Sequence, residues 1–263
     1  MKLINSGISV SNIDKISCRH CQTRKSCLMR VFSDSEANNV DCLVTHEKPM
    51  RKGQNLFLQG DKFQSLYLVR SGSFKSCFTD ETGERQVTGF HFSHDILGID
   101  GIDPGRHIRE VEALETSSVC TLPFQLFKEV SLRDNRGLYD ELICNVSGMM
   151  SKANHLLMTL TKIRAEQRLA SFLLDISQSM YERRQSPYEF KLPMARYDIA
   201  NYLGLAVETV SRLFKRLEEQ GLIVAQRHRL HIVDIDGLHS MATGAYLGSK
   251  VGYGEQLSCR SIG

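Results

Sequence analysis

Apolar residues fall on two rows, each with a seven-residue repeat, between residues 136 and 163. The first row contains Tyr139, Val146, Ala153 and Leu160, and the second contains Leu142, Met149, Leu156 and Ile163. This repeat is typical of the seam between two coiled helices, and no proline interrupts it. At about 1.5 Å per residue such a helix spans roughly 42 Å, so a second copy of the chain would be needed to cover the seam. We therefore predict a dimerisation helix over residues 136–163; the alternative is a long helix buried within one chain.

Short β-rich runs separated by glycines fill residues 47–125. The runs include NLFLQ, SLYLVR, SFKSCF and RQVTGFHF, and most of them end close to a glycine. Short strands with regular turn signals predict an antiparallel β-roll or jelly roll. None of these glycines belongs to a phosphate-binding loop of the GxxxxGK type, and no Ser/His/Asp or paired-carboxylate arrangement stands out.

A helix-turn-helix pattern begins at Ala195 with ARYDIANYLGLAVETVSRLFKRLEEQGLI. Its apolar positions are Ile199, Ala200 and Leu203 on a first helix and Val210, Leu213 and Leu217 on a second. Gly204 permits the tight turn between the two helices, and Gly221 follows the second helix. LIVAQ and LHIVD, on either side of a basic turn, then predict a two-stranded wing.

The second helix of this pattern carries polar residues on the face opposite its apolar row. The expected base-reading residues are Val207, Glu208, Ser211 and Arg212, and the expected phosphate contacts are Lys215 and Arg216. Arg212 can donate two hydrogen bonds to a guanine edge, and Glu208 can accept one from a cytosine amino group. Phosphate contacts fix the register of the helix on DNA without reading its sequence. A solvated amphipathic face is the alternative interpretation.

Composition indicates where such a protein would work. The chain has 263 residues, of which 41% are hydrophobic and 24% are charged, as in ordinary soluble proteins. It contains no run of about 20 apolar residues, and MKLINSGISV lacks the apolar core of a signal peptide. We therefore expect a cytoplasmic protein without a membrane partner. Residues 190–231 carry seven Lys/Arg against four Asp/Glu, which favours nucleic-acid binding by this part of the chain.

Cysteines near the N-terminus form a candidate metal site. Cys18, Cys21 and Cys27 have the spacing C-x2-C-x5-C, and residues 15–30 add five cations and no acidic residue. We expect these cations to lower the thiol pKa values and to offset the charge of a thiolate-bound inorganic centre, which suits an iron–sulfur cluster. A zinc site completed by His20 or a remote cysteine fits the spacing equally well, and reactive surface thiols are a third interpretation.

The motifs together resemble the FNR group of oxygen-sensing regulators within the CRP superfamily. The resemblance rests on C-x2-C-x5-C, ALETSSVCTLPF, RAEQRLASFL and NYLGLAVETVSRLFKRL, and it runs from about Cys18 to Leu238. It implies an α+β architecture: an N-terminal β-roll of the cyclic-nucleotide-binding type, a long dimerisation helix and a C-terminal winged helix-turn-helix. By motif position it also implies that Cys120 joins Cys18, Cys21 and Cys27 as the fourth ligand of a [4Fe–4S] cluster.

The same resemblance implies the partners and the mechanism. A homodimer would bind palindromic double-stranded DNA with TTGAT-like half-sites and would contact RNA polymerase; it would not be an enzyme. An intact cluster would tether the N-terminal segment to Cys120 and shift the β-roll against the dimerisation helix, and oxygen or nitric oxide would dismantle the cluster. The alternatives are a zinc- or thiol-redox-dependent regulator and an iron–sulfur enzyme or electron carrier, for which no substrate motif is present.

Two departures from related sequences carry further expectations. Cyclic-AMP-binding relatives hold the nucleotide with a Glu in a GELG-type turn, whereas Ile96 stands in the corresponding turn here, so we expect no cyclic nucleotide. Ala153 stands on the seam where the FNR group often has an acidic residue. We therefore expect a dimer that depends less completely on the cluster. Four cysteines match no ligand position and are treated as ordinary thiols: Cys42, Cys77, Cys144 and Cys259.

These observations divide the chain into five parts. The expected parts are a cysteine-rich cluster-binding segment (1–30), a β-roll sensor domain (31–135), the dimerisation helix (136–163), a winged helix-turn-helix domain (164–240) and a flexible tail (241–263).

Overall fold

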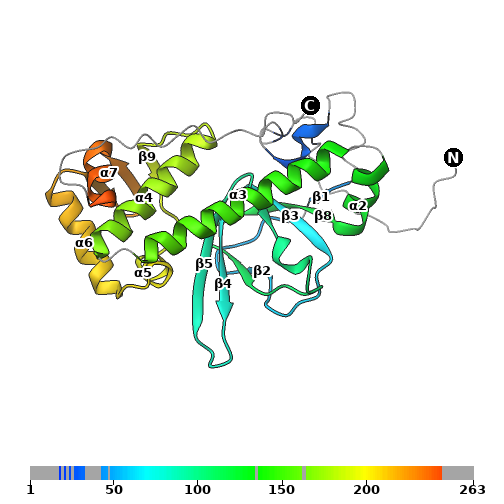
Figure 1. Ribbon diagram of the computed structural model, residues 1–263, viewed down its shortest axis with the longest axis horizontal. Coiled ribbons are helices and arrows are strands. Elements are labelled where there is room, and N and C mark those ends of the chain that lie inside the picture. The colour runs from blue at the N-terminus through cyan, green and yellow to red at the C-terminus, as the bar shows by residue number, and fades with distance from the viewer. Residues whose placement is uncertain are drawn as a thin grey trace.

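A long helix, α3 (Arg136–Leu160), joins a β-sheet domain to a mostly helical C-terminal domain in the computed structural model (Figure 1). The structure describes residues 18, 21, 24, 27–32, 43–46, 48–133, 136–161 and 164–244. Helix α3 therefore covers the described part of the predicted 136–163 segment up to Leu160, and Ile163 lies outside the described residues. Within the described residues, no helix is both long and apolar enough to cross a membrane.

The N-terminal domain contains two four-stranded antiparallel sheets. Their strands are β1 (Thr45–His46), β2 (Asn55–Phe57), β3 (Ser65–Ser71), β4 (Ser73–Thr79), β5 (Arg85–Phe92), β6 (Ile96–Leu97), β7 (Glu110–Ala113) and β8 (Ser118–Pro123). One sheet has the order β1-β8-β3-β6 and the other β2-β7-β4-β5. Phe57, Phe74 and Val111 from the second sheet pack with Val69 and Val119 from the first. This confirms the expected β-roll.

The C-terminal domain is a winged helix-turn-helix, as the sequence predicts. Its elements are α4 (Ala165–Glu182), β9 (Glu189–Lys191), α5 (Arg196–Leu203), α6 (Val207–Glu219), β10 (Ile223–Gln226), β11 (Arg229–Ile232) and α7 (Ile235–Thr243). The apolar rows pack as expected, with Ile199, Leu203, Val210 and Leu217 all buried in one core. Gly204 ends α5 with φ of 61°, a left-handed conformation that a residue with a Cβ adopts at a cost. Helix α7, which the sequence pattern does not predict, continues past the expected domain boundary at residue 240.

One face of α3 is covered by its own chain, and this contradicts the predicted seam at Leu142. Short helices α2 (Phe124–Arg133) and η3 (Leu28–Val31) pack beside α3, and Leu138 and Leu142 are buried in the same apolar cluster. Leu142 is only 5% exposed, so it cannot serve a dimer seam as we expected. Met149 and Leu156, which follow it in that row, are partly buried.

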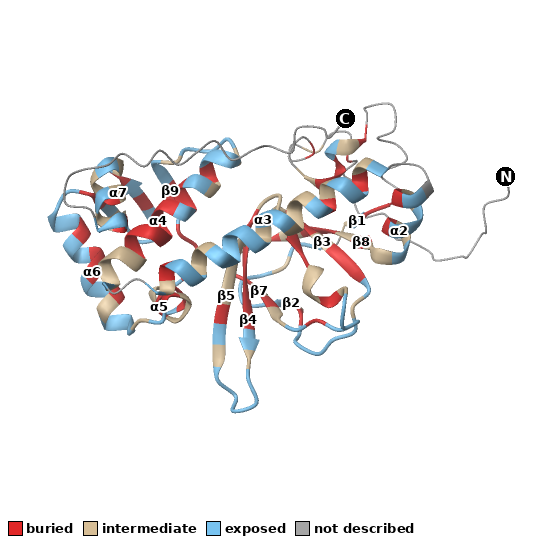
Figure 2. Ribbon diagram, viewed as in Figure 1, coloured by how far each residue is buried: buried red, intermediate tan, exposed pale blue. Residues whose placement is uncertain are grey.

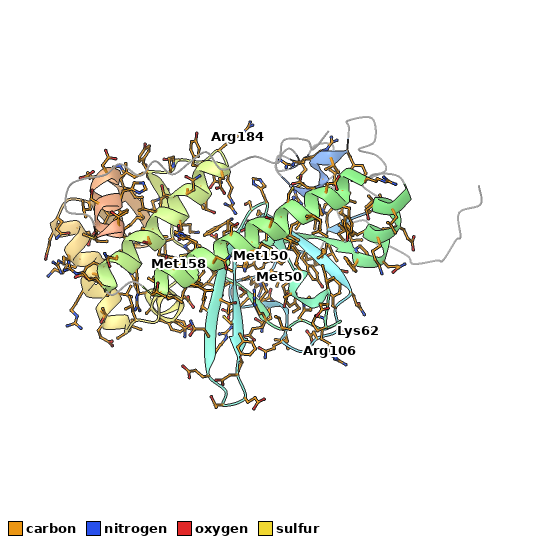
Figure 3. All side chains as sticks on the ribbon, in the orientation of Figure 1. Met50, Lys62, Arg106, Met150, Met158 and Arg184 are labelled. Carbon is orange, nitrogen blue, oxygen red and sulfur yellow. The ribbon has the colours of Figure 1, made fainter. Side chains whose placement is uncertain are left out.

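The apolar residues that remain uncovered on α3 form a row shifted by one position from the predicted second row. Exposed positions run along the whole helix in Figure 2, and Met150 is labelled on it in Figure 3. Ile143, Met150 and Leu157 are 52%, 63% and 62% exposed. They lie beside the row of Tyr139, Val146, Ala153 and Leu160, and the two rows alternate at spacings of three and four residues. In the first predicted row, Tyr139 and Ala153 are exposed, whereas Val146 and Leu160 are partly buried, and Val146 packs against the cluster that contains Leu142. We retain that row in the prediction of a dimer seam and expect Ile143, Met150 and Leu157 in place of the second row.

The β-roll and the C-terminal domain share a buried ion pair. Lys75 Nζ in β4 lies 2.8 Å from Asp198 Oδ1 in α5 and 3.4 Å from Glu112 Oε1 in β7. The Lys75 and Asp198 side chains are each 5% exposed. Burial by itself lowers the pKa of Lys75, but the ion pairs with Asp198 and Glu112 outweigh it, and the net effect raises the pKa. Lys75 is therefore charged at neutral pH inside the interdomain contact.

Hydrogen bonds from Asn201 extend this contact along β5. The Asn201 side chain accepts from the backbone amide of Val87 and donates to the carbonyl of Arg85, the latter over 2.9 Å. The Gln86 side-chain amide in turn donates to the backbone carbonyl of Asn201 over 2.6 Å. Helix α5 lies next to β5 in Figure 1. The first helix of the helix-turn-helix is thus bonded directly to a strand of the β-roll.

Candidate metal centre and DNA-recognition helix

The four cysteines predicted to be ligands line one pocket. Cys18, Cys21 and Cys27 come from the N-terminal segment, and Cys120 comes from β8. The rest of the lining consists of two arginines, Arg24 and Arg70, and apolar side chains that include Met29, Val44 and Leu68. The pocket therefore joins residues that are far apart in sequence and offers four sulfur donors in mainly apolar surroundings.

The spacing of the N-terminal cysteines follows from a three-residue repeat in the backbone. The amide of Cys21 donates to the carbonyl of Cys18, Arg24 donates to Cys21, and Cys27 donates to Arg24, over 3.2, 3.2 and 3.4 Å. Bonds between residues three apart place the side chains at every third position on one side of the chain. Arg24 occupies the position between Cys21 and Cys27, so the x5 interval contains one extra turn with an arginine facing the same side.

Packing anchors this segment to the rest of the domain. Arg24 is buried and donates from Nη2 to the carbonyl of Phe32 over 2.7 Å. Cys27 precedes η3, and Leu28 and Met29 within η3 are each 1% exposed. On the opposite wall of the pocket, Cys120 lies within a sheet and is held by pairing on both sides. The pocket therefore has one rigid wall and one wall attached through η3.

The pKa values of the buried thiols contradict one expectation from the sequence. Burial raises the pKa of Cys27 to about 11 and that of Cys120 to about 12, and repulsion between neighbouring thiolates adds to both shifts. Arg24 lowers the pKa of Cys27 and Arg70 lowers that of Cys120, but neither offsets the loss of hydration. The expectation of a low net pKa is therefore wrong for the two thiols, although the nearby cations lower it as expected. A metal centre would have to displace their protons on binding.

The pocket differs from a compact site for one ion. Among the residues that the structure describes, no three His, Cys, Asp or Glu side chains lie close enough together to hold a single metal ion. The four sulfurs are distributed over the walls of the pocket. Of the other cysteines, Cys77 is buried in β4 away from this pocket, and Cys42 and Cys259 lie outside the described residues. Cys144 in α3 is disulfide-bonded, so the expectation of an ordinary thiol is wrong for this residue.

Two residues near the Cys120 sulfur have no signal in the sequence. His46 in β1 stands directly opposite Cys120, and its Nδ1 lies 3.3 Å from the Cys120 Sγ. Arg70 lines the pocket. No motif marks either residue in the sequence, because their position depends on how β1 and β3 flank β8.

Helix α6 presents the predicted DNA-binding residues on its outer face. Its inner face contains four buried residues, Val210, Leu213, Phe214 and Leu217. The residues on the outer face are all exposed: Val207, Glu208, Ser211, Arg212, Lys215 and Arg216. Within the part of the chain that the structure describes, Arg212 donates one hydrogen bond, to the backbone carbonyl of Glu208 over 3.3 Å. Arg216 instead forms an exposed ion pair of 2.7 Å with Glu166 of α4, and a phosphate would have to compete with that carboxylate.

Comparison with known proteins supports the same division of the chain. Residues 167–241 match the family described as "Crp-like helix-turn-helix domain", and residues 47–134 match "Cyclic nucleotide-binding domain". The fumarate and nitrate reduction regulatory proteins of Salmonella typhimurium and Escherichia coli K12 are each 37% identical over 227 residues, which is 86% of this chain and 90% of each relative. The chain belongs to the CRP/FNR superfamily of transcription regulators.

Solved structures of CRP/FNR proteins have the same fold. FixK2 from Bradyrhizobium japonicum aligns with a TM-score of 0.67 and 26% identity over 75% of this chain and 96% of its own. A CRP-family transcriptional regulator from Thermus thermophilus, TTHB099, aligns with a TM-score of 0.61 over 75% of this chain and 97% of its own; at 18% identity it shows the fold alone. The protein is an FNR-like DNA-binding transcription regulator, and the family predicted from the sequence motifs is confirmed.

The turn that contains Ile96 makes contacts within the protein. Ile96 is 3% exposed within β6. The neighbouring Asp95 forms a 2.7 Å ion pair with Arg183, the residue that follows α4. Burial would raise the pKa of Asp95, but Arg183 and other cations outweigh it and lower the pKa. The absence of a cyclic nucleotide effector stays a prediction.

Proposed function

We propose that this CRP/FNR regulator binds a [4Fe–4S] cluster through Cys18, Cys21, Cys27 and Cys120, and that oxygen or nitric oxide switches it off by removing the cluster. The convergence of the four cysteines on one pocket carries this proposal. A donor set of four thiols in mainly apolar surroundings fits an iron–sulfur cluster. When bound, the cluster would supply the oxygen-sensitive centre. The cluster-loaded dimer would bind palindromic DNA with TTGAT-like half-sites and would contact RNA polymerase.

Contacts through η3 connect the pocket to the dimer helix. Leu28 and Met29 of η3 belong to the same apolar cluster as Cys18, Cys120 and Leu142. Helix η3 thereby packs between the pocket and α3. Closing the pocket would hold η3 in place, and η3 would in turn support the covered face of α3.

An ion pair adds to this connection on the surface. Arg30 of η3 pairs with Glu141 of α3 over 2.7 Å, and the two side chains are 41% and 13% exposed. Because the pair is partly solvated, it contributes modestly to stability, on the order of 1 kcal/mol or less. Its geometry nevertheless fixes the end of η3 against α3 beside the exposed seam.

Anaerobic purification with iron and sulfide analysis tests the cluster. Wild-type protein should contain iron and acid-labile sulfide, and replacing any one of the four pocket cysteines by serine should remove most of both, because one iron loses its ligand. Cys77→Ser is the matched control, since Cys77 is a buried cysteine outside the pocket and should leave the cluster unchanged. Wild-type protein with zinc and no sulfide, or full iron and sulfide in Cys120→Ser, would contradict the proposal.

Arg212 and Lys215 should have different effects on DNA binding. Arg212→Ala should weaken binding to the matched site by about 1–3 kcal/mol and relax discrimination at one base pair, because it removes a base contact. Lys215→Ala should weaken matched and scrambled sites alike and reduce the salt dependence, because it removes a phosphate contact. Titrations of both DNAs at several salt concentrations measure this. Equal effects of the two substitutions on both DNAs would refute the assignment.

Ala153 should make the dimer less dependent on the cluster. Ala153 is exposed on the retained row of the seam, where an acidic residue would bring two carboxylates together across the dimer axis. Ala153→Asp should therefore shift cluster-free protein towards monomer. Sedimentation of both proteins without cluster, over micromolar concentrations, measures the difference. If the two are equally monomeric, Ala153 does not set the dimerisation threshold.

A further inference from the structure

Cys120 has a histidine neighbour that the ligand assignment does not use. His46 in β1 and Cys120 in β8 are directly paired residues of adjacent antiparallel strands. Side chains at paired positions project from the same face of a sheet, and here the His46 Nδ1 lies 3.3 Å from the Cys120 Sγ. This separation is within the hydrogen-bonding range for sulfur. The contact therefore follows from strand register as well as from side-chain conformation.

The chemistry of the two groups determines the direction of this hydrogen bond once Cys120 is a ligand. A metal-bound cysteine is a thiolate and has no proton to donate, so the imidazole must donate. That selects the tautomer of His46 with its proton on Nδ1. His46 is not among the described residues that line the pocket.

Cys120 is also the one predicted ligand, among the four, that the β-roll supplies. The other three ligands belong to the N-terminal segment, whereas Cys120 belongs to a sheet strand with neighbours on both sides. A hydrogen bond from β1 would hold the Cys120 side chain in one orientation towards the pocket. Hydrogen bonds to ligand sulfurs also withdraw negative charge from the centre and raise its reduction potential.

We propose that His46 is a positioning residue for Cys120: its Nδ1–H donates to the Cys120 sulfur, orients that ligand and stabilises the bound cluster. This inference rests on the proposed function, because it takes Cys120 as a cluster ligand. It assigns His46 a role outside the set of iron ligands, and it makes retention of the cluster and its reduction potential depend on a residue that no cysteine motif includes.

Three substitutions test the donor. His46→Leu removes it, whereas His46→Asn keeps an N–H close to the position of Nδ1; His231→Leu, on an exposed position of β11 in the wing, is the control. The anaerobic cluster-loaded proteins are mixed with an iron chelator, and the loss of visible absorbance is followed. His46→Leu should lose the cluster about tenfold faster or more, as is typical when a partner of a metal ligand is removed. His46→Asn should retain most of the wild-type stability, and His231→Leu all of it.

Two spectroscopic readouts separate a hydrogen-bond donor from a ligand or a merely structural residue. The reduction potential should fall in His46→Leu and recover in His46→Asn. Pulsed electron paramagnetic resonance of reduced protein with 15N-labelled histidine should show a weak nitrogen coupling that His46→Leu abolishes. A strong coupling would identify His46 as an iron ligand and overturn the proposal.

The other possible outcomes also test the role of His46. Unchanged cluster loss and potential in His46→Leu would overturn the role of His46 while leaving the cluster proposal intact. If His46→Asn loses the cluster as fast as His46→Leu and has the same reduction potential, the N–H donor does not stabilise the cluster. That result would also overturn the role of His46. Wild-type protein that assembles no iron and sulfide would overturn the proposed function and this inference together.

Discussion

Lys75→Met should lower the free energy of unfolding by about 3–5 kcal/mol, which is the usual effect of removing one partner from a buried ion pair. The substitution keeps the length of the side chain but leaves the Asp198 carboxylate without its 2.8 Å partner in a site where both side chains are 5% exposed. Chemical denaturation at neutral pH measures the change. The pKa of Lys75 is higher in the folded protein than in the unfolded chain. This stabilisation is therefore complete below the pKa of an unfolded lysine, and it is lost as the pH rises from that value through the higher pKa of the folded protein.

A second substitution distinguishes this effect from loss of packing. Lys75→Met combined with Asp198→Asn removes both charges, while the remaining amide oxygen can still accept the Ala195 N–H bond that Asp198 accepts at the start of α5. Most of the lost stability should therefore return in the double variant, because no charge is left buried without a partner. Glu112 keeps an ion pair with Arg85 over 2.7 Å in both proteins. A loss below about 1 kcal/mol in Lys75→Met would contradict the buried-pair interpretation.

Met150→Asp should convert the dimer to monomer, whereas Met149→Asp should have a much smaller effect. Met150 is 63% exposed on the uncovered seam, and Met149 belongs to the row that turns towards its own chain. Aspartate at position 150 would place two unpaired carboxylates in the dimer contact, which costs several kcal/mol and raises the dimer dissociation constant by about a thousandfold or more. Sedimentation velocity of anaerobic, cluster-loaded protein measures the dissociation.

The neighbouring methionines control for each other, since both substitutions place the same helix-disfavouring aspartate in α3 at adjacent positions. Circular dichroism should show similar helix content in both variants. If Met149→Asp dissociates the dimer and Met150→Asp does not, the seam contains the row of Leu142, Met149 and Leu156 that the sequence pattern predicts.

The error in that row shows what a heptad pattern lacks. Helix α3 has apolar residues in three neighbouring rows, because Leu142 and Ile143, Met149 and Met150, and Leu156 and Leu157 are adjacent pairs. A seven-residue repeat identifies the helix and its length. It does not say whether the row of Tyr139 forms a seam with the row of Leu142 or with the row of Ile143, because both pairs have the required spacing. The choice depends on which face η3 and the β-roll cover, and only tertiary packing determines that.

The winged helix-turn-helix was predictable for the opposite reason. In α6 the buried and exposed residues separate cleanly, so a single apolar face is compatible with the sequence and the remaining face must be exposed. The resemblance to the FNR group likewise placed Cys120 with the N-terminal cysteines, and the structure brings them to one pocket. Their raised pKa values were not predictable, because hydration depends on burial, whereas the sequence shows only the nearby cations.

Contacts between residues far apart in the chain left no trace in the sequence. Lys75 and Asp198 are 123 residues apart, and each reads as an ordinary polar residue of a strand or helix. His46 and Cys120 are 74 residues apart and meet only through strand pairing. Periodicity reports which face of an element is apolar, but it does not report which element will cover a polar side chain.

The bonds between Asn201 and β5 have a consequence for solubility. Strand β5 is the outermost strand of its sheet, and the Asn201 amide bonds to the Val87 N–H and the Arg85 carbonyl along it. A side-chain amide thus occupies backbone groups that would otherwise be open to pairing with a strand of another molecule. Any movement that separates the C-terminal domain from the β-roll also unmasks this edge. Conditions that favour domain separation should therefore favour aggregation, and the interdomain contact protects the protein against it.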